Sequence, residues 1–132
     1  MVCLDTTFLI DLLRKKPEAE KKLSSLMKRS DAPSVAVVTL GELFYGAYKS
    51  KNVEMEKEKI NGVLGGLLML ELDKYGAEKF GQLLASLDQA GQKINDRDVL
   101  IAAIAMSKNE NAIVTRNSKD FEKIPGIVVE SY

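Results

Sequence analysis

The sequence predicts an α/β fold, in which helices cover both faces of a mostly parallel sheet. Short apolar runs with the composition of buried strands alternate along the chain with longer segments of helical periodicity. One helical segment, Val99 to Met106, is apolar on all of its faces and therefore belongs inside a layered structure. The 132 residues contain no repeat and no Pro- or Gly-rich linker, which favours a single domain spanning residues 1–132.

Five short apolar runs are the predicted strands, because polar or turn-forming residues bound them. They cover residues 2–5, 34–38, 67–72, 112–115 and 127–129. The segments between them carry apolar residues three and four positions apart, which predicts helices. The predicted helices cover residues 6–13, 17–29, 39–51, 53–64, 76–90, 99–106 and 118–122. Local signals support two of them, since Pro17 suits a first helical turn and Gly91 a helix stop.

The composition excludes several kinds of enzyme. The chain has no histidine and one cysteine, so it offers no imidazole base and no His/Cys set for zinc. Lys and Arg together number 19, as do Asp and Glu, so any attraction for phosphate must be local. If the protein is an enzyme, we expect carboxylates and an oxygen-preferring metal ion to carry its chemistry.

Two features of the sequence indicate where in the cell the protein is expected. The lone Cys3 cannot form an intrachain disulfide, which favours a reducing, cytoplasmic location. The longest apolar stretch, Val63 to Leu72, is interrupted by two glycines and an acid and is too short to span a membrane. We therefore expect no membrane association.

Three acidic residues, Asp5, Glu42 and Asp98, lie at element boundaries or beside apolar runs. In a parallel sheet the functional groups gather at the carboxyl ends of the strands, where Asp5 and the segment Thr115–Asn117 fall. Taken alone, two of these acids also have a structural interpretation. Asp5 is suited to cap the helix that follows it, and Asp98 to occupy the third position of a helix capped by Asn95.

Other acids near these positions are predicted to face solvent. On its helix Glu42 falls opposite the apolar stripe, so periodicity alone predicts that it is exposed. Asp11 is interpreted as a solvated position on the first helix. Asp96 is two residues from Asp98, so their side chains diverge by about 200° and at most one of them points at a shared site.

Aromatic and basic residues give weaker indications. Phe44, Tyr45 and Tyr48 lie on one predicted helix, where a core or dimer contact is favoured over a platform for stacked bases. Basic spots such as Arg116 with Lys119 are interpreted as solvated surface, with a path for a phosphate backbone as the alternative.

Four segments, taken together and in order, resemble the motifs of PIN-domain proteins of the VapC toxin type. They are Leu4–Leu13, Thr39–Gly46, Asn95–Ala105 and Thr115–Phe121. The resemblance spans nearly the whole chain and implies a Rossmann-like three-layer α/β/α sandwich. It also implies dependence on Mg²⁺, for which Mn²⁺ substitutes, an RNA substrate, homodimers and a cognate VapB-type antitoxin whose tail covers the groove.

The resemblance assigns the acids of the family to Asp5, Glu42 and Asp98, as both catalytic residues and metal ligands. Three neighbouring carboxylates repel one another unless a cation is bound, which supports a metal site on physical grounds. Asp5 and Asp98 are expected to be the most direct ligands, and Glu42 to bind directly or through water, or to orient the attacking water. The predicted activity is that of an endoribonuclease toxin, whose products carry a 5′-phosphate and a 3′-hydroxyl.

The resemblance departs from the family at one position. Many relatives have a fourth acid where this chain has Asn117. Asp96, or less favourably Asp120, is a candidate replacement, with water as the alternative. Thr115 matches a polar position that helps to orient the site, and Thr6 is a further supporting residue.

Two alternative functions remain. An aspartate-based phosphatase or phosphotransferase would use Asp5 as its nucleophile, although such enzymes usually have a second Asp where this chain has Thr7. A catalytically silent PIN-type interaction module would have lost its site together with the fourth acid.

Overall fold

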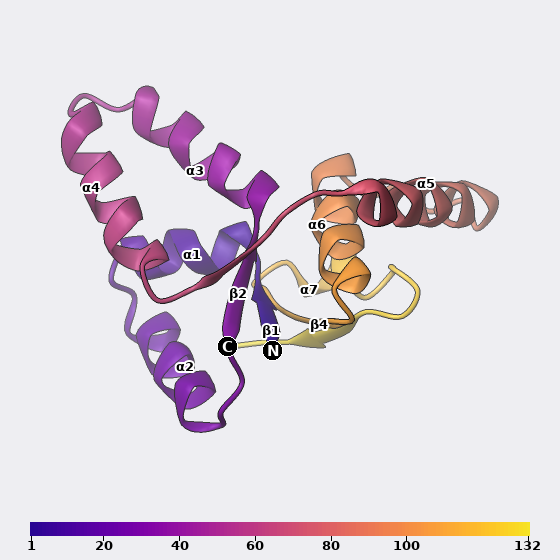
Figure 1. Cartoon of the computed structure of the whole chain (residues 1–132), viewed down its shortest axis with the longest axis horizontal. Helices are drawn as coiled ribbons and strands as arrows, with labels where there is room; N and C mark the ends of the chain where they lie inside the picture. Colours follow the sequence, from indigo (N-terminus) through magenta and orange to yellow (C-terminus); the bar gives the residue numbers. More distant parts are fainter.

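The computed structural model describes residues 1–132, and its centre is a five-stranded sheet in which all neighbouring strands are parallel. The strands lie in the order β3-β2-β1-β4-β5, with the first strand of the chain in the middle (Figure 1). Their bounds are β1 Val2–Leu4, β2 Pro33–Ala36, β3 Leu68–Leu70, β4 Ala112–Val114 and β5 Val128–Glu130. The predicted α/β fold with a parallel sheet is therefore confirmed.

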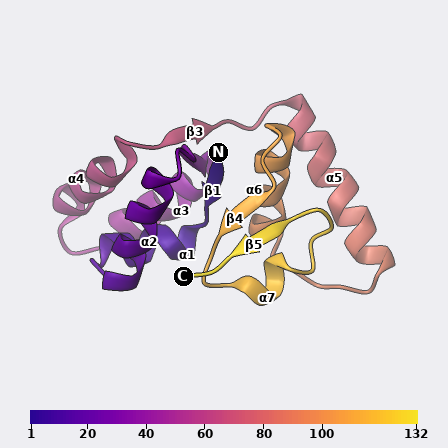
Figure 2. The same ribbon diagram turned by 90° about the horizontal axis from the view of Figure 1, so that it is seen from below.

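Helices flank the sheet on both sides. Their bounds are α1 Thr6–Leu13, α2 Pro17–Lys28, α3 Val37–Tyr48, α4 Val53–Leu64, α5 Lys74–Gln89, α6 Asp96–Ser107 and α7 Ser118–Phe121. Helices α1 to α4 lie on one side, and α5, α6 and α7 on the other (Figure 1 and Figure 2). None of them combines the length and the apolar character that a membrane crossing requires.

Each face of the sheet has its own apolar core. Successive residues of β1 alternate between the two cores: Val2 and Leu4 pack with α1, α2 and α4, whereas Cys3 packs with α5 and α6. Burial on both faces explains why the strands have continuous apolar sequences. Helix α6 is central to the second core, and its residues Ile101 to Ala105 are fully buried, as the sequence predicted.

Helix α3 begins at Val37, two residues before the predicted start at Thr39. The β-branched pair Val37 and Val38 favours a strand by residue type, but the pairing of β2 with β3 ends at Ala36. Tertiary pairing therefore overrides local propensity here.

Helix α6 begins at Asp96, three residues before its apolar part at Val99 and at the start expected for a helix capped by Asn95. Asn95 caps it, because its side-chain oxygen accepts a hydrogen bond from the N–H of Arg97 at 2.9 Å. Asp98 therefore occupies the third position of this helix, as the sequence predicted.

Candidate active site

The site is built where β1 and β4 end beside each other. Leu4 is paired with Val114, so the residues that follow them, Asp5 and Thr115, are neighbours although 110 positions separate them. The main-chain N–H of Asp5 donates to the carbonyl oxygen of Val114 at 2.9 Å. Oδ2 of Asp5 accepts hydrogen bonds from the hydroxyls of Thr115 at 2.7 Å and Thr7 at 2.9 Å. Two hydroxyls thus fix the orientation of this carboxylate.

The other carboxylate oxygen of Asp5 has no partner. Asp5 is 2% exposed, and its Oδ1 is buried without a hydrogen bond. The side chain does not cap α1, so the capping interpretation of this acid is wrong. A buried, unpaired carboxylate oxygen costs free energy, and a cation in contact with it would remove that cost.

Asp98 is half-buried and surrounded by negative charge. Burial first, and then the charges of Asp5, Asp120 and Glu42, raise the pKa of the Asp98 carboxyl to about 6. The side-chain amide of Asn117 donates to Oδ2 of Asp98 at 3.2 Å. The acids predicted from three distant segments therefore act on one another electrostatically.

Glu42 is half-buried, although helical periodicity alone predicts an exposed side chain. The hydroxyl of Thr6 donates to its Oε1 at 2.8 Å and lies 3.1 Å from the hydroxyl of Thr39. Nη1 of Arg97 lies 3.4 Å from its Oε2. The pairing of β1 with β2 directs the polar face of α3 at the start of α1 and α6. Helical periodicity within α3 does not reveal this arrangement.

Asp120, rather than Asp96, is the additional acid beside Asp98. The amide of Asn117 donates to Oδ2 of Asp120 at 3.0 Å as well as to Asp98, so one neutral side chain bridges two carboxylates. Asp96 is exposed at the start of α6 and lines a separate hollow with Lys93. The sequence-based preference for Asp96 over Asp120 is therefore wrong as a matter of geometry.

Thr7 and Asp11 are structural participants that sequence reasoning did not identify. Thr7 was considered as the position where phosphatases usually have a second Asp, yet its hydroxyl donates to Asp5 and accepts the main-chain N–H of Arg116 at 3.1 Å. Its position two residues after Asp5 was the only available signal. Asp11 is buried, not solvated as predicted, because Arg116 and Tyr132 from the end of the chain cover it.

The carboxylate oxygens of the site are the kind of ligand that a magnesium-like ion prefers, although they do not converge on a single point. No three acidic or cysteine side chains converge tightly enough to hold a metal ion in the arrangement described. Glu42 is instead engaged by Thr6 and Arg97. Mg²⁺ commonly keeps several waters and uses only one or two carboxylates, a number that Asp5 and Asp98 supply. An unpartnered carboxylate oxygen and a carboxyl whose pKa is raised by other acids are both features that a divalent cation would stabilise.

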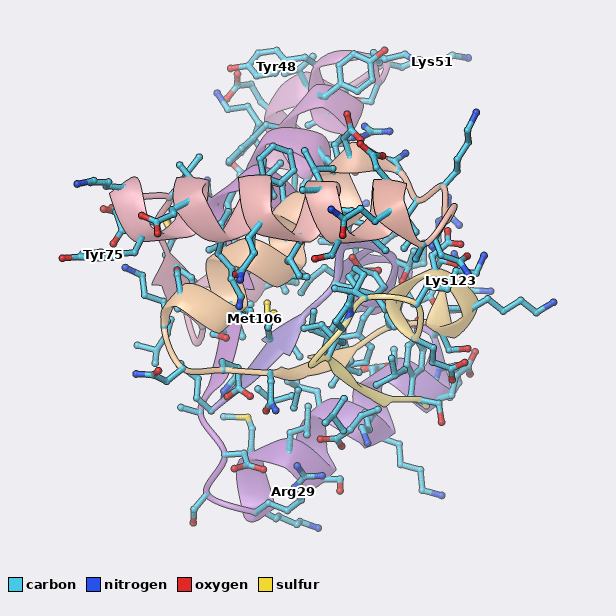
Figure 3. The ribbon with its side chains drawn as sticks, turned by 90° about the vertical axis from the view of Figure 1, so that its right-hand side faces the viewer. Arg29, Tyr48, Lys51, Tyr75, Met106 and Lys123 are labelled. Carbon is cyan, nitrogen blue, oxygen red and sulfur yellow. The ribbon has the colours of Figure 1, made fainter.

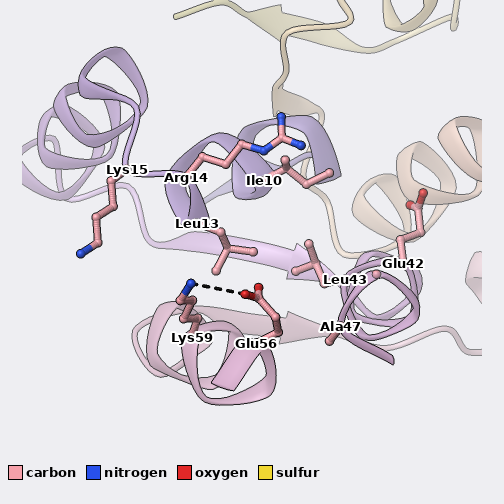
Figure 4. Close-up of a pocket in the computed structure, with 10 residues that line it drawn as sticks. Ile10, Leu13, Arg14, Lys15, Glu42, Leu43, Ala47, Glu56 and Lys59 are labelled. Atoms are coloured by element: carbon pink, nitrogen blue, oxygen red, sulfur yellow. Dashed lines mark hydrogen bonds and ion pairs between the residues drawn. The ribbon is translucent and has the colours of Figure 1, made fainter. Parts of the chain in front are cut away.

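A groove of about 590 Å³ adjoins the site between α1, α3 and α4 (Figure 4). Its apolar lining residues are Ile10, Leu13, Leu43 and Ala47. Glu42 belongs to both the groove and the acidic cluster, so the two are continuous. Basic side chains of Arg14, Lys15 and Lys59 also line the groove, and Lys59 is paired with Glu56 at 3.3 Å.

The aromatic residues of α3 are not core residues as a group. Tyr45 and Tyr48 are each 63% exposed, and only Phe44 packs partly against the core. Tyr48 and Lys51 lie at one extremity of the molecule, where α3 gives way to α4 (Figure 3). Of the interpretations offered by the sequence, burial in the core is therefore wrong for the two tyrosines.

The chain matches the family model described as PIN domain over residues 2–127. Among curated relatives, it is 30% identical to Ribonuclease VapC2 of Rickettsia felis and 33% identical to the tRNA(fMet)-specific endonuclease VapC of Salmonella typhimurium. Each match extends over 129 residues, which are 98% of this chain and 96% of the relative.

Solved structures give the same result. The structure of VapBC2 from Rickettsia felis bound to a promoter DNA fragment matches with a TM-score of 0.92 and 30% identity, and covers 100% of this chain and 99% of the other. DNA-bound VapBC from Salmonella typhimurium matches with a TM-score of 0.89 and 32% identity, and covers 99% and 98%. The chain therefore belongs to the PIN-domain family and, within it, to the VapC ribonucleases of VapBC toxin–antitoxin systems.

Proposed function

We propose that this VapC-type ribonuclease is a Mg²⁺- or Mn²⁺-dependent endonuclease whose catalytic acids are Asp5, Glu42 and Asp98. The observation that carries the proposal is the buried, unpartnered Oδ1 of Asp5 in a cluster where burial and neighbouring acids raise the pKa of Asp98 to about 6. Asp5 and Asp98 would hold the metal ion, and Glu42 would bind it through water or orient the attacking water. A divalent ion held there would lower the pKa of a water molecule and polarise the scissile phosphate.

Neutral side chains fix the acids in place. The hydroxyls of Thr115 and Thr7 occupy Oδ2 of Asp5, which leaves Oδ1 as the free ligand oxygen. Asn117 holds Asp98 by donating to its Oδ2, where relatives with a fourth acid would add another negative charge. Thr6 orients Glu42. Because neutral side chains hold the acids in place, few charged ligands are needed at the ion, which suits an ion that keeps its own waters.

Water is the nucleophile in this mechanism, and its in-line attack on phosphorus breaks the bond to the 3′ oxygen, so the products carry a 5′-phosphate and a 3′-hydroxyl. The ribose 2′-OH does not react, and a preference for RNA must come from shape and contacts. The Salmonella relative is named a tRNA(fMet)-specific endonuclease, so we propose tRNA as the first substrate class to test. The cytoplasm remains the predicted compartment, because both the RNA substrate and a reduced Cys3 belong there.

The decisive experiment compares cleavage of a total RNA pool with and without Mg²⁺ and sequences the new 5′ ends. Asp5→Asn and Asp98→Asn should each abolish the metal-dependent cleavage while keeping the far-UV circular dichroism spectrum of the wild type. Asp96→Asn is the matched control on the same helix, and it should cleave normally. Undiminished cleavage by both site variants would refute the assigned roles.

The groove between α1, α3 and α4 is proposed to receive a segment of the cognate antitoxin, since the matching solved structures are of VapBC complexes. Its apolar floor and its basic residues fit an apolar segment that carries acidic side chains. Gly46 lines this groove, and a Cβ added there meets nothing within 4 Å. Gly46→Phe should weaken antitoxin binding in calorimetry without reducing RNA cleavage, and unaltered binding would exclude the groove.

A homodimer remains a proposal. Four large apolar side chains, those of Leu68, Met69, Leu72 and Tyr75, are each 45% to 73% exposed along β3 and the start of α5. An exposed apolar stretch beside a free sheet edge is a common contact between copies. Light scattering should give the mass of a dimer for the wild type and of a monomer for Met69→Lys, and a monomeric wild type would end the proposal.

A further inference from the structure

Asp11 is a buried acid that the proposed chemistry does not use. It lies on α1 six residues after Asp5 and is only 2% exposed. Nη1 of Arg116 donates to its two carboxylate oxygens at 3.0 and 3.2 Å, and the hydroxyl of Tyr132 donates to Oδ2. The carboxylate therefore gathers two donors from the far end of the chain onto the first helix.

Arg116 stands between two residues that bond to the catalytic acids. Thr115 donates to Asp5, and Asn117 donates to Asp98. The main chain of the segment is also fixed, because the N–H of Arg116 donates to the hydroxyl of Thr7 at 3.1 Å. The N–H of Asn117 donates to the hydroxyl of Thr115 at 2.9 Å. Of the groups that hold this segment, the side chain of Arg116 is the only one with a positive charge.

Tyr132 attaches to the same carboxylate from a different direction. Its ring packs edge-on against the fully buried Phe8, with 4.7 Å between ring centroids and 74° between ring planes. Burial and the neighbouring Asp11 raise the pKa of the Tyr132 hydroxyl, so that it remains a donor. Tyr132 thus helps to bury the carboxylate of Asp11, and hydrogen bonds to a buried, ionised carboxylate are among the stronger ones in proteins.

We infer that Asp11 is a positioning residue, which holds the segment Thr115–Asn117 in register with α1 through Arg116. The inference deepens the proposed function, because it rests on Asp5 and Asp98 being the catalytic acids. Asp11 touches neither of them, so its effect is indirect. When the pair is broken, the segment gains freedom, and the bonds from Thr115 to Asp5 and from Asn117 to Asp98 are made for a smaller fraction of the time.

Three variants isolate the pair. Asp11→Asn and Arg116→Gln break it from its two ends, and the second variant alters a side chain that is 54% exposed. Tyr132→Phe is the matched control, since it removes the other hydrogen bond to the same carboxylate and leaves Arg116 in place. If Asp11→Asn does not fold, Arg116→Gln decides the question.

The first readout is amide hydrogen exchange at Arg116 and Asn117 in the full chain without RNA. Both N–H groups are hydrogen-bonded within the segment, so exchange should be at least about tenfold faster in the two pair-breaking variants and near wild type in Tyr132→Phe. The second readout is Mn²⁺ affinity from the electron paramagnetic resonance signal of the free ion, which should fall several-fold in the same two variants. In cleavage assays Asp11→Asn should lower kcat about tenfold with little change in KM.

A purely structural role for Asp11 predicts a different result. A lower melting temperature in Asp11→Asn or Arg116→Gln, with wild-type exchange at both amides and wild-type Mn²⁺ affinity, would overturn the inference. Failure of the proposed function is distinguishable, because it shows as a wild-type protein that does not cleave RNA. The exchange experiment needs no RNA and stands independently of that result.

Discussion

The two oxygens of the Asp5 carboxylate have opposite environments, and the difference defines the site at the scale of single residues. Oδ2 accepts two hydroxyl hydrogen bonds, whereas Oδ1 accepts none although it is buried. Buried polar atoms without partners are rare in proteins and occur preferentially where function requires them. Asp5 occupies the N-cap position of α1, but its side chain makes no capping hydrogen bond and is directed to the site instead.

Asn117 offers a test of how charge is balanced in the cluster. Its amide donates to both Asp98 and Asp120, so Asn117→Asp replaces two favourable bonds by repulsion between three carboxylates. Without metal, the free energy of unfolding should fall by about 1–3 kcal/mol. Mg²⁺ should raise the melting temperature of this variant more than that of the wild type, because the added acid increases the affinity for a cation.

The measurement is thermal unfolding followed by circular dichroism with and without Mg²⁺. Asn61→Asp makes the same chemical change at an exposed position of α4 and should behave like the wild type. An Asn117→Asp protein that is as stable as the wild type without metal would contradict the account of the cluster.

At the scale of elements, the sequence was informative where a contact is local and silent where it is not. The position of Asp5 at the end of an apolar strand favoured a place at the site, whereas the position of Asp98 at the start of an apolar helix suggested capping, and the resemblance assigned it to the site. Glu42 was predicted to be exposed, and only the resemblance to the VapC family assigned it to the site. Its partner Thr6 lies 36 positions away, and no periodicity within α3 contains that information.

Asp11 shows the same limit more clearly. Its neighbours in sequence are those of an ordinary amphipathic helix, so a solvated position was a reasonable interpretation. Its burial depends on Arg116 and Tyr132, which are 105 and 121 positions away. The strand order β1-β4-β5 brings them there, and such pairings are set by the whole fold.

Strand β5 is tied to α2 by charge, which gives a pH-dependent prediction. Glu130 accepts hydrogen bonds from Lys22 and Arg29, each at 2.9 Å, and Arg29 with Lys22 lowers the pKa of Glu130 to about 2. The folded pKa lies below the ordinary value of 4.5, so this stabilisation is present above pH 4.5 and is lost as the pH falls from 4.5 toward 2.

Glu130→Gln should therefore lower stability at neutral pH by about 1 kcal/mol or less, since Arg29 is partly exposed. Melting temperatures measured from pH 7 to pH 3 should show the difference between variant and wild type shrinking below pH 4.5. Glu54→Gln removes an acid whose side chain is 84% exposed and should show no such trend. A difference that stays constant with pH would contradict the prediction.

At the scale of the whole molecule, one sheet joins two apolar cores into a cooperative unit. Leu9 belongs to one core and Ile104 to the other, and both are fully buried. Leu9→Ala and Ile104→Ala should each lower the free energy of unfolding by about 2–5 kcal/mol. Urea unfolding followed by circular dichroism and by tyrosine fluorescence should give coincident single transitions in both variants, whereas separate transitions would mean that the cores unfold independently.

The comparisons with relatives and the geometry of the site argue against both alternative functions considered from the sequence. An aspartate-based phosphatase finds no support in the relatives, and Thr7 donates to Asp5 at the position where that class usually has a second acid. The match to VapC ribonucleases along 98% of the chain argues instead for the nuclease. Asn117 does not by itself mark a decayed site, since it is engaged with both neighbouring carboxylates.

The joining of Asp5 to Thr115 across the sheet has a consequence for how such a protein is made. During translation the first carboxylate leaves the ribosome early, but β4 and the hydroxyl that orients it are synthesised close to the end. A chain whose synthesis stops before β4 therefore lacks part of the candidate active site. It lacks the hydroxyl that orients Asp5, so we expect cleavage activity to arise only when synthesis is almost finished.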